Sequence, residues 1–274
     1  MSNNGKIISY YGGKSEMAQR LIEWMPKHKI YLEPFAGGLS VFFKKKKAET
    51  NIVNDYDKDI ANLYYVCSRI DLFEEFIERV QWLVQSSEIY NKIRDTIKSD
   101  KKHKIKIPNV QRAVDYFFFI TTSFNNRPGT NLSKNTNKWD LEMIERLKYT
   151  RKKMDNVVIE NLDINRFIKK YHKKQDALWF FDPPYYVAND TSYYGHVFSA
   201  YQHQNFKESI DLLANNPSAR FMITYDDHEK IRELFSEYFI KEIPVKYRST
   251  YDTIETNEIL ITNYKVYDKQ QSLF

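Results

Sequence analysis

Short apolar runs alternate with helical patterns in two stretches of the chain. The first stretch has an expected strand at residues 30–32, a helical run to residue 47 and a second strand at 51–55. In the second stretch, strands are expected at residues 157–160, 178–181, 220–225, 239–247 and 258–264, with helices at 165–172, 202–215 and 227–238. Runs this short are typical of buried strands, and their alternation with helices predicts an α/β fold with a seven-stranded mixed sheet.

The segment between these stretches has a different character. From residue 63 to 156 the pattern is helical and rich in lysine, with amphipathic helices expected at 71–85 and 110–122 and a solvated loop at 99–104. We therefore expect one domain built from residues 1–62 and 157–274, and an inserted, mainly helical domain from residues 63–156.

A polar stretch near the end of the inserted segment is rich in amide and cationic side chains. Amide and guanidinium groups are the side chains that read adenine and guanine edges with paired hydrogen bonds. The plainer interpretation of the same composition is a solvated loop. The candidate nucleic-acid contacts in this stretch are Asn125, Asn126, Arg127, Lys134 and Lys138.

Composition narrows the classes of partner and compartment. The chain has 42 Lys and Arg against 36 Asp and Glu, a formal net charge of +6, which favours a polyanionic partner without requiring one. Its single cysteine, Cys67, excludes an internal disulfide framework and a cysteine-rich zinc site, so no metal is expected. The polar start and the lack of a long apolar run predict a cytoplasmic protein without a signal peptide or membrane span.

The most informative motif follows the strand expected at 178–181, where Asp182, Pro183, Pro184 and Tyr185 come directly after apolar residues. Ligands of open α/β sheets bind at the carboxyl ends of the strands. The two prolines remove two backbone donors, which leaves the carbonyls of Asp182 and Pro183 to accept hydrogen bonds from a ligand. A planar amine held there and stacked on Tyr185 would direct its lone pair at an electrophile. The plainer interpretation is a strand that ends in a turn.

A second candidate site follows the strand at 30–32. Residues 33–38 form a glycine turn before a helix, the first half of a nucleoside-binding unit, and Asp55 ends the next strand where such folds hold ribose hydroxyls. Asp55 has an alternative role as the cap of a helix expected at 59–67. Nearer the N-terminus, a glycine turn and Lys14 precede a helix expected at 15–25, capped by Ser15. This turn lacks the first glycine of a phosphate loop, which excludes nucleotide hydrolysis.

In this order and spacing, the motifs resemble the Dam-type DNA adenine methyltransferases, the alpha group of amino-methyltransferases that use S-adenosylmethionine. The resemblance covers most of residues 6–264 and rests on the segments 10–14, 33–38, 54–55, 182–185 and 258–264. It implies a Rossmann-like methyltransferase fold, S-adenosyl-L-methionine as cofactor and double-stranded DNA as partner. The implied reaction is site-specific methylation of the 6-amino group of a flipped adenine.

The resemblance also implies roles for individual residues. His203 stands where the family tends to keep a histidine, with an ordinary place near a helix start as the alternative. The implied catalytic residues are Asp182, Pro183, Pro184 and Tyr185. The implied cofactor-binding residues are Tyr10, Tyr11, Gly12, Gly13, Lys14, Glu33, Pro34, Phe35, Ala36, Gly37, Asp55, Asp163, Ile164 and Asp182.

The chain departs from the family's pattern in two places. Leu39 stands where the family usually has a second glycine, which predicts a differently shaped cofactor loop unless Gly38 supplies the needed freedom. Residues 124–129 begin like the family's recognition segment and then diverge, so the resemblance does not support a GATC target.

Two other functions stay open at this point. One is methyl transfer to the 4-amino group of cytosine or to a protein glutamine, against which the family habit of an aspartate at position 182 argues. The other is a catalytically inactive DNA-binding relative, against which the filled catalytic positions argue. A monomer or weak dimer is expected, and a cognate restriction endonuclease is a candidate partner.

Overall fold

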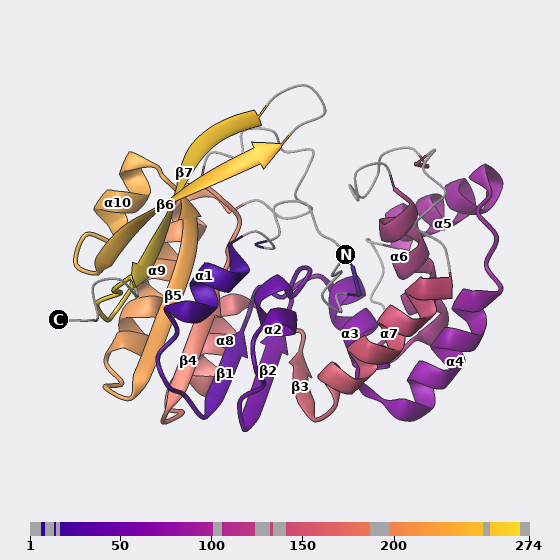
Figure 1. Cartoon of the computed structure of the whole chain (residues 1–274), viewed down its shortest axis with the longest axis horizontal. Coiled ribbons are helices and arrows are strands. Elements are labelled where there is room, and N and C mark those ends of the chain that lie inside the picture. The colour runs from indigo at the N-terminus through magenta and orange to yellow at the C-terminus, as the bar shows by residue number, and fades with distance from the viewer. Residues whose placement is uncertain are drawn as a thin grey trace. The chain divides into compact units, whose positions relative to one another are not determined.

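A computed structural model describes residues 7–8, 14, 17–100, 106–123, 132–133, 141–186, 198–248 and 253–268. Its strands form one seven-stranded sheet in the order β3-β2-β1-β4-β5-β7-β6 (Figure 1). β4 is parallel to both of its neighbours, β1 and β5, whereas β7 is antiparallel to β5 and to β6. The expected α/β fold with a seven-stranded mixed sheet is confirmed.

The strands follow the apolar runs of the sequence closely. All of the expected strands are present, and their bounds differ from the expected ones by a few residues at most, except at the start of β7. The strands are β1 (Ile30–Glu33), β2 (Thr50–Asn54), β3 (Val157–Glu160), β4 (Ala177–Phe181), β5 (Ala219–Asp226), β6 (Phe239–Arg248) and β7 (Thr253–Thr262).

The described residues divide into two compact units. Unit 1 takes its residues from 1–15, 36–47 and 53–161, and unit 2 takes its residues from 16–35, 48–52 and 162–274. The helices of unit 1 are α2 (Ser40–Lys44), α3 (Lys58–Ser68), α4 (Ile70–Gln81), α5 (Ser87–Asp100), α6 (Val110–Thr122) and α7 (Leu141–Met154). Those of unit 2 are α1 (Ala18–Glu23), α8 (Ile164–Tyr171), α9 (Ala200–Ala214) and α10 (Glu229–Leu234).

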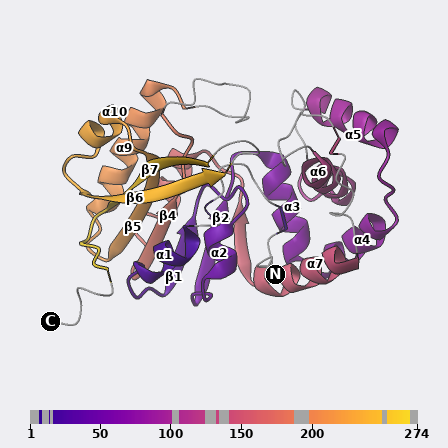
Figure 2. The same cartoon turned by 45° about the horizontal axis from the view of Figure 1, so that its top comes forward.

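Unit 1 is built around helix α6, which contacts α3, α4 and α5 (Figure 2). The helix is apolar over most of its length, and its buried phenylalanines pack on rings from its neighbours. Phe117 meets Phe76 of α4 edge-on at 5.6 Å, and Phe119 lies 5.6 Å from Tyr90 of α5. These contacts explain why an aromatic-rich helix lies at the centre of the unit rather than at its surface.

The core of unit 2 is formed by side chains of its strands and of the helices that cover them. All five residues of β4 are buried, as expected for a strand flanked by parallel neighbours. Trp179 and Phe181 project from the same face of β4 with their rings stacked at 5.8 Å, and Phe167 of α8 and Phe206 of α9 cover them. β4 is therefore a rigid base for the residues that follow it.

Three local expectations were wrong. Helix α1 begins at Ala18 with Met17 as its N-cap, so Ser15 does not cap it. Ser99 belongs to helix α5 rather than to a loop, and its hydroxyl donates to the carbonyl of Thr96 at 2.9 Å. Helix α10 covers only the middle of the expected range 227–238. It begins after its N-cap His228, which accepts from the amide of Lys230, and it ends before its C-cap Phe235.

Candidate active site

Asp182 is the first residue after β4, in the place that the sequence predicts. It is half-buried, and Pro183 behind it is buried. The hydroxyl of Thr224, on β5, donates to Oδ1 of Asp182 at 2.9 Å. β1 and β4 are parallel neighbours, so residues that follow them lie at the same edge of the sheet. The chain runs outward from this pair in both directions, which makes the edge a topological switch point, where α/β sheets bind ligands.

Tyr185 and Tyr186 lie in an aromatic cluster beside Asp182. The ring of Tyr185 is half-buried and lies 6.5 Å from that of Tyr225. The ring of Tyr186 is 5.1 Å from His203 and 4.7 Å from His228, and its backbone N–H donates to Asp226 at 3.0 Å. The loop that carries the motif is thus held by packing and by hydrogen bonds.

His203, on helix α9, is buried in this cluster. Its Nδ1 lies 2.9 Å from the hydroxyl of Tyr225, while its Nε2 is buried and has no hydrogen-bond partner among the described residues. Burial lowers the pKa of His203 to about 4, so the ring is neutral at neutral pH. The structure therefore places this histidine beside the motif rather than merely at a helix start.

The aromatic contacts also reach Phe35, which follows β1. Phe35 packs edge-on against Phe198 at 5.9 Å and against Phe206 at 5.8 Å, and Phe198 in turn lies 5.4 Å from His203. Phe35, from the expected cofactor motif, is thus linked through Phe198 to the cluster around Tyr186. The sequence motifs alone give no signal for this connection.

Glu33, the last residue of β1, is held by a hydrogen bond from Tyr31 of the same strand. Glu33 is buried and accepts a hydrogen bond from the hydroxyl of Tyr31 at 2.7 Å. Burial, and then the charge of Glu33, raise the pKa of Tyr31 well above its usual value. The phenol therefore stays protonated and continues to donate to Glu33, which fixes the carboxylate at the carboxyl end of β1.

The glycine loop of unit 1 has two residues in the left-handed region. Gly37 has φ 43°, and Leu39 has φ 49° and ψ 39°. Both backbone polar groups of Gly37 make hydrogen bonds. Its N–H donates to Oδ2 of Asp55 at 2.9 Å, and its carbonyl accepts from the Tyr64 hydroxyl at 2.6 Å. Leu39 itself adopts the conformation that favours glycine, whereas Gly38 is not among the described residues with a positive φ. The expected difference in loop shape from the family stays a prediction.

Asp55 is the carboxylate that fixes this loop. Besides Gly37, it accepts the N–H of Asp57 at Oδ1, at 2.9 Å. Asp57, and not Asp55, caps helix α3 by accepting from the amide of Asp59, so the capping alternative for Asp55 was wrong. An ideal Cβ on Gly37 would meet no heavy atom of the described residues within 4 Å, so they leave the space beside Gly37 open. A carboxylate next to such an opening can accept hydrogen bonds from the hydroxyl groups of a ligand.

Burial, and then the charge of Asp57, raise the pKa of Asp55 to about 7, although three backbone N–H groups oppose the rise. The carboxyl group of Asp55 therefore holds its proton more tightly in the folded chain than in the unfolded chain, where its pKa is near 3.8. The resulting contribution to the free energy of unfolding is fully present below pH 3.8 and is lost as the pH rises toward 7. We expect it to decline by about 1.4 kcal/mol per pH unit in that window. Carbon-detected NMR titration of the carboxyl groups should give a midpoint near 7 for Asp55.

Asp57→Asn is the matched variant for this titration, because asparagine still caps helix α3 while the neighbouring charge is removed. In this variant the midpoint of Asp55 should fall below that of the unmodified chain. The loss of stability with pH, measured by urea unfolding, should then end at a lower pH than in the unmodified chain. A midpoint near 4 in the unmodified chain would contradict the assignment.

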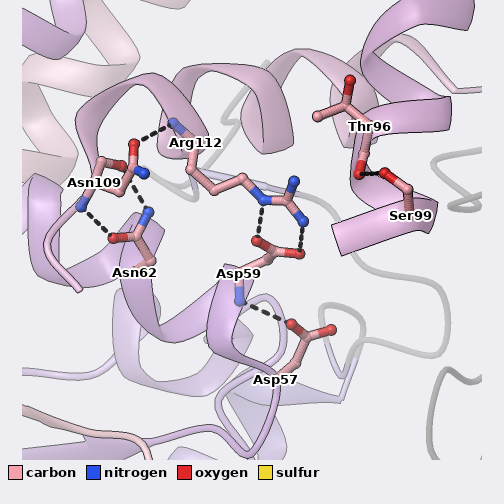
Figure 3. A network of polar contacts seen from close by, with 7 residues as sticks. All are labelled: Asp57, Asp59, Asn62, Thr96, Ser99, Asn109 and Arg112. Atoms are coloured by element: carbon pink, nitrogen blue, oxygen red, sulfur yellow. Dashed lines mark hydrogen bonds and ion pairs between the residues drawn. The ribbon is translucent and has the colours of Figure 1, made fainter. Parts of the chain in front are cut away.

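Helix α3 is tied to helix α6 by a buried polar network (Figure 3). Arg112 donates from Nε to Oδ1 of Asp59 at 2.6 Å and from a terminal nitrogen to Oδ2 at 3.0 Å. One turn on, the Asn62 side chain exchanges two hydrogen bonds with the backbone of Asn109, each 2.8 Å long. The helix that begins beside Asp55 is thereby fixed against the central helix of unit 1.

The other expected site residues fall into two groups. Among those described, Lys14 is buried, Ile164 is buried, and Asp163 is exposed and caps helix α8 by accepting from the amide of Asn165 at 3.0 Å. The residues that lie outside the described part of the chain are Tyr10, Tyr11, Gly12, Gly13, Asn125, Asn126, Arg127, Lys134 and Lys138.

Comparison with known proteins identifies the family. The profile of the D12 class N6 adenine-specific DNA methyltransferases matches residues 10–250. The chain belongs to this family. It is therefore an enzyme, a methyltransferase, and its methyl donor is S-adenosylmethionine. The D12 match spans the glycine loop, the inserted helices and the residues that follow β4, which confirms the resemblance to the Dam-type enzymes.

Several solved structures are similar to this D12 chain at low sequence identity, and no curated protein matches its sequence. A precorrin-6y C5,15-methyltransferase from Geobacter metallireducens has a TM-score of 0.41 and 6% identity, over 92% of this chain and 87% of that one. A SAM-dependent methyltransferase from Agrobacterium tumefaciens has a TM-score of 0.40 and 11% identity, over 90% and 59%. An rRNA methylase from Streptococcus thermophilus has a TM-score of 0.34 and 9% identity, over 90% and 93%.

The described residues contain neither of two other kinds of site. Within this part of the D12 chain, no helix combines the length and apolar character needed to cross a membrane. Over the same residues, no three or more His, Cys, Asp or Glu side chains gather in a way that could hold a metal ion.

Proposed function

We propose that the enzyme transfers a methyl group from S-adenosylmethionine to the exocyclic 6-amino group of an adenine flipped out of duplex DNA. The observation that carries the proposal is the Asp182 carboxylate, fixed by Thr224 at the end of β4 and followed by two prolines and a tyrosine. The family match supports the choice of adenine.

The residues after β4 supply the chemistry that this acceptor needs. An adenine amine is a poor nucleophile, because its lone pair is delocalised into the ring. Asp182 accepts one of its protons in a hydrogen bond and the Pro183 carbonyl accepts the other, which draws the nitrogen toward a tetrahedral arrangement. The bound sulfonium supplies an electrophilic methyl carbon. Catalysis by these residues is then positioning plus electrostatic stabilisation.

Tyr185 stabilises the flipped base. Extrusion of a paired base costs a few kcal/mol, and stacking on an aromatic ring returns about 1–3 kcal/mol. The ring of Tyr185 is half-buried, and the contacts of its neighbour Tyr186 with His203 and His228 hold the loop in place. This arrangement suits a base that enters from solvent and stacks on one face of the tyrosine.

We further propose that Asp55 binds the ribose hydroxyls of the cofactor and that residues 63–156 contact DNA. The buried carboxylate beside the open glycine loop supports the first role. The net charge of +6 and the polar stretch with Asn125, Asn126 and Arg127 support the second. A cognate restriction endonuclease remains a candidate partner in the cell.

Methyl transfer from tritiated S-adenosylmethionine to duplex DNA tests the proposal. After digestion to nucleosides, we expect the label in N6-methyladenine, and sequencing of plasmid DNA from cells that express the chain should show the modified site. Label in N4-methylcytosine, or in an added protein instead of DNA, would overturn the choice of adenine. DNA binding without any transfer would favour an inactive relative.

A further inference from the structure

The end of strand β5 holds both ends of the segment 182–186, which directly follows β4. β5 pairs in parallel with β4 (Figure 1). Thr224 and Asp226 lie two residues apart on β5, so their side chains leave the same face of the strand. Thr224 donates to the Asp182 carboxylate at 2.9 Å, and Asp226 accepts the N–H of Tyr186 at 3.0 Å. The segment 182–186 is thus fixed at its first and its last residue by one neighbouring strand.

We propose that Thr224 is a positioning residue for methyl transfer: its hydroxyl sets the orientation of the Asp182 carboxylate toward the target amine. The inference rests on the proposed transfer to an adenine amine, and it adds to that proposal a residue outside the motif. Thr224 itself touches neither the base nor the cofactor in this role, since it acts through Asp182.

The direction of the hydroxyl proton follows from its two acceptors. Oγ1 of Thr224 lies 2.9 Å from Oδ1 of Asp182 and 3.3 Å from the carbonyl oxygen of Phe181. A hydroxyl carries one proton, and a hydrogen bond to an ionised carboxylate is shorter and stronger than one to a neutral carbonyl. The proton is therefore donated to Asp182, and it fixes a terminal torsion that is otherwise broad for an aspartate.

The position of Thr224 argues against a role in packing alone. Its side chain is fully buried, and the residues before it on β5, Met222 and Ile223, are fully buried and apolar. A valine has nearly the same shape and would avoid the cost of a buried hydroxyl, which is about 1–3 kcal/mol when no hydrogen bond compensates it. The hydroxyl is explained by the carboxylate that it contacts.

Asp226 holds the other end of the segment 182–186, at Tyr186. By accepting the N–H of Tyr186, it fixes the backbone directly after Tyr185, whose ring is to stack on the base. The cation of Lys230 lies 5.5 Å from the centre of the Tyr186 ring and adds to this anchoring. β5 therefore supports the acceptor for the amine and the platform for the ring together.

Steady-state and single-turnover kinetics of three variants test the inference on duplex DNA. Thr224→Val keeps the volume and removes the donor, Thr224→Ala removes the donor with less bulk, and Thr224→Ser keeps the donor. We expect the valine and alanine variants to lose ~10- to 100-fold in kcat, as a small misplacement of a catalytic group costs. Their KM for S-adenosylmethionine should stay near that of the unmodified enzyme, and Thr224→Ser should restore most of the rate.

The possible outcomes separate this inference from the proposed function. If the unmodified enzyme methylates adenine and Thr224→Val or Thr224→Ala is equally fast, the positioning role is overturned and the proposed function stands. If Thr224→Ser is as slow as Thr224→Val, packing rather than the hydroxyl matters, and the inference again fails. An unmodified enzyme that transfers no label to adenine overturns both. Thermal melting of each variant identifies those that are folded, and Thr224→Ala replaces Thr224→Val if the valine does not fold.

Discussion

Replacement of Asp182 by alanine is expected to abolish most methyl transfer while the protein still folds and binds DNA. The carboxylate is half-buried and accepts from Thr224, and in the proposed reaction it accepts a proton of the target amine as well. Loss of one such preorganised group typically lowers kcat by about 10²–10³-fold. Single-turnover transfer of tritiated methyl to duplex DNA measures the effect, and gel shift measures DNA binding.

Asp268→Ala is the matched control for this experiment. It removes a carboxylate of the same unit, one that is largely exposed and pairs with Lys241 at 2.9 Å. This variant should retain the rate of the unmodified enzyme. If Asp182→Ala also retained it, the residues after β4 would not be the catalytic ones, and the proposed mechanism would be wrong.

The largest expected effect on stability comes from the ion pair between Arg112 and Asp59. Both side chains are about 95% buried, and the guanidinium makes two hydrogen bonds to the carboxylate. Arg112→Met leaves a buried charge without its partner, which typically costs about 3–5 kcal/mol. Urea unfolding followed by circular dichroism should show the midpoint of unit 1 falling accordingly.

Two further variants separate the pair from other causes. Arg69→Met breaks an exposed pair with Asp71 at 3.2 Å and should leave the midpoint nearly unchanged. The double variant Asp59→Leu with Arg112→Met removes both charges and should recover much of the lost stability, since apolar groups of similar volume can replace a buried pair. A double variant no more stable than Arg112→Met would point to lost packing instead.

The central strands β2, β1, β4 and β5 were predictable from the sequence because each is a short apolar run whose residues are mostly buried. β4 is the clearest example: its five buried residues deliver Asp182 where the pattern places it. The glycine loop and Asp55 were predictable for a similar reason, since a strand, a glycine turn and a second strand with an acidic end follow one another locally.

The contacts that hold the site together could not be predicted in this way. Thr224 reaches Asp182 only through the register between β4 and β5, and an apolar run does not encode which residues of two strands stand side by side. The hydrogen bond between His203 and Tyr225 likewise depends on how helix α9 lies against β5. The N-cap of α3 is Asp57, two residues after Asp55, and a shift of two residues is within the usual uncertainty of helix ends.

The leucine at position 39 makes the glycine loop rigid. Its left-handed backbone costs roughly 1–2 kcal/mol, and its fully buried side chain is what holds that conformation in place. A glycine there would sample several turn shapes before a ligand arrived, whereas leucine ties one shape to the interior of the protein. The shape of the loop is thus fixed during folding, so binding of a ligand there loses little further chain entropy. For the proposed cofactor site this means that damage to the surrounding core should weaken binding even without any change in the residues that touch the ligand.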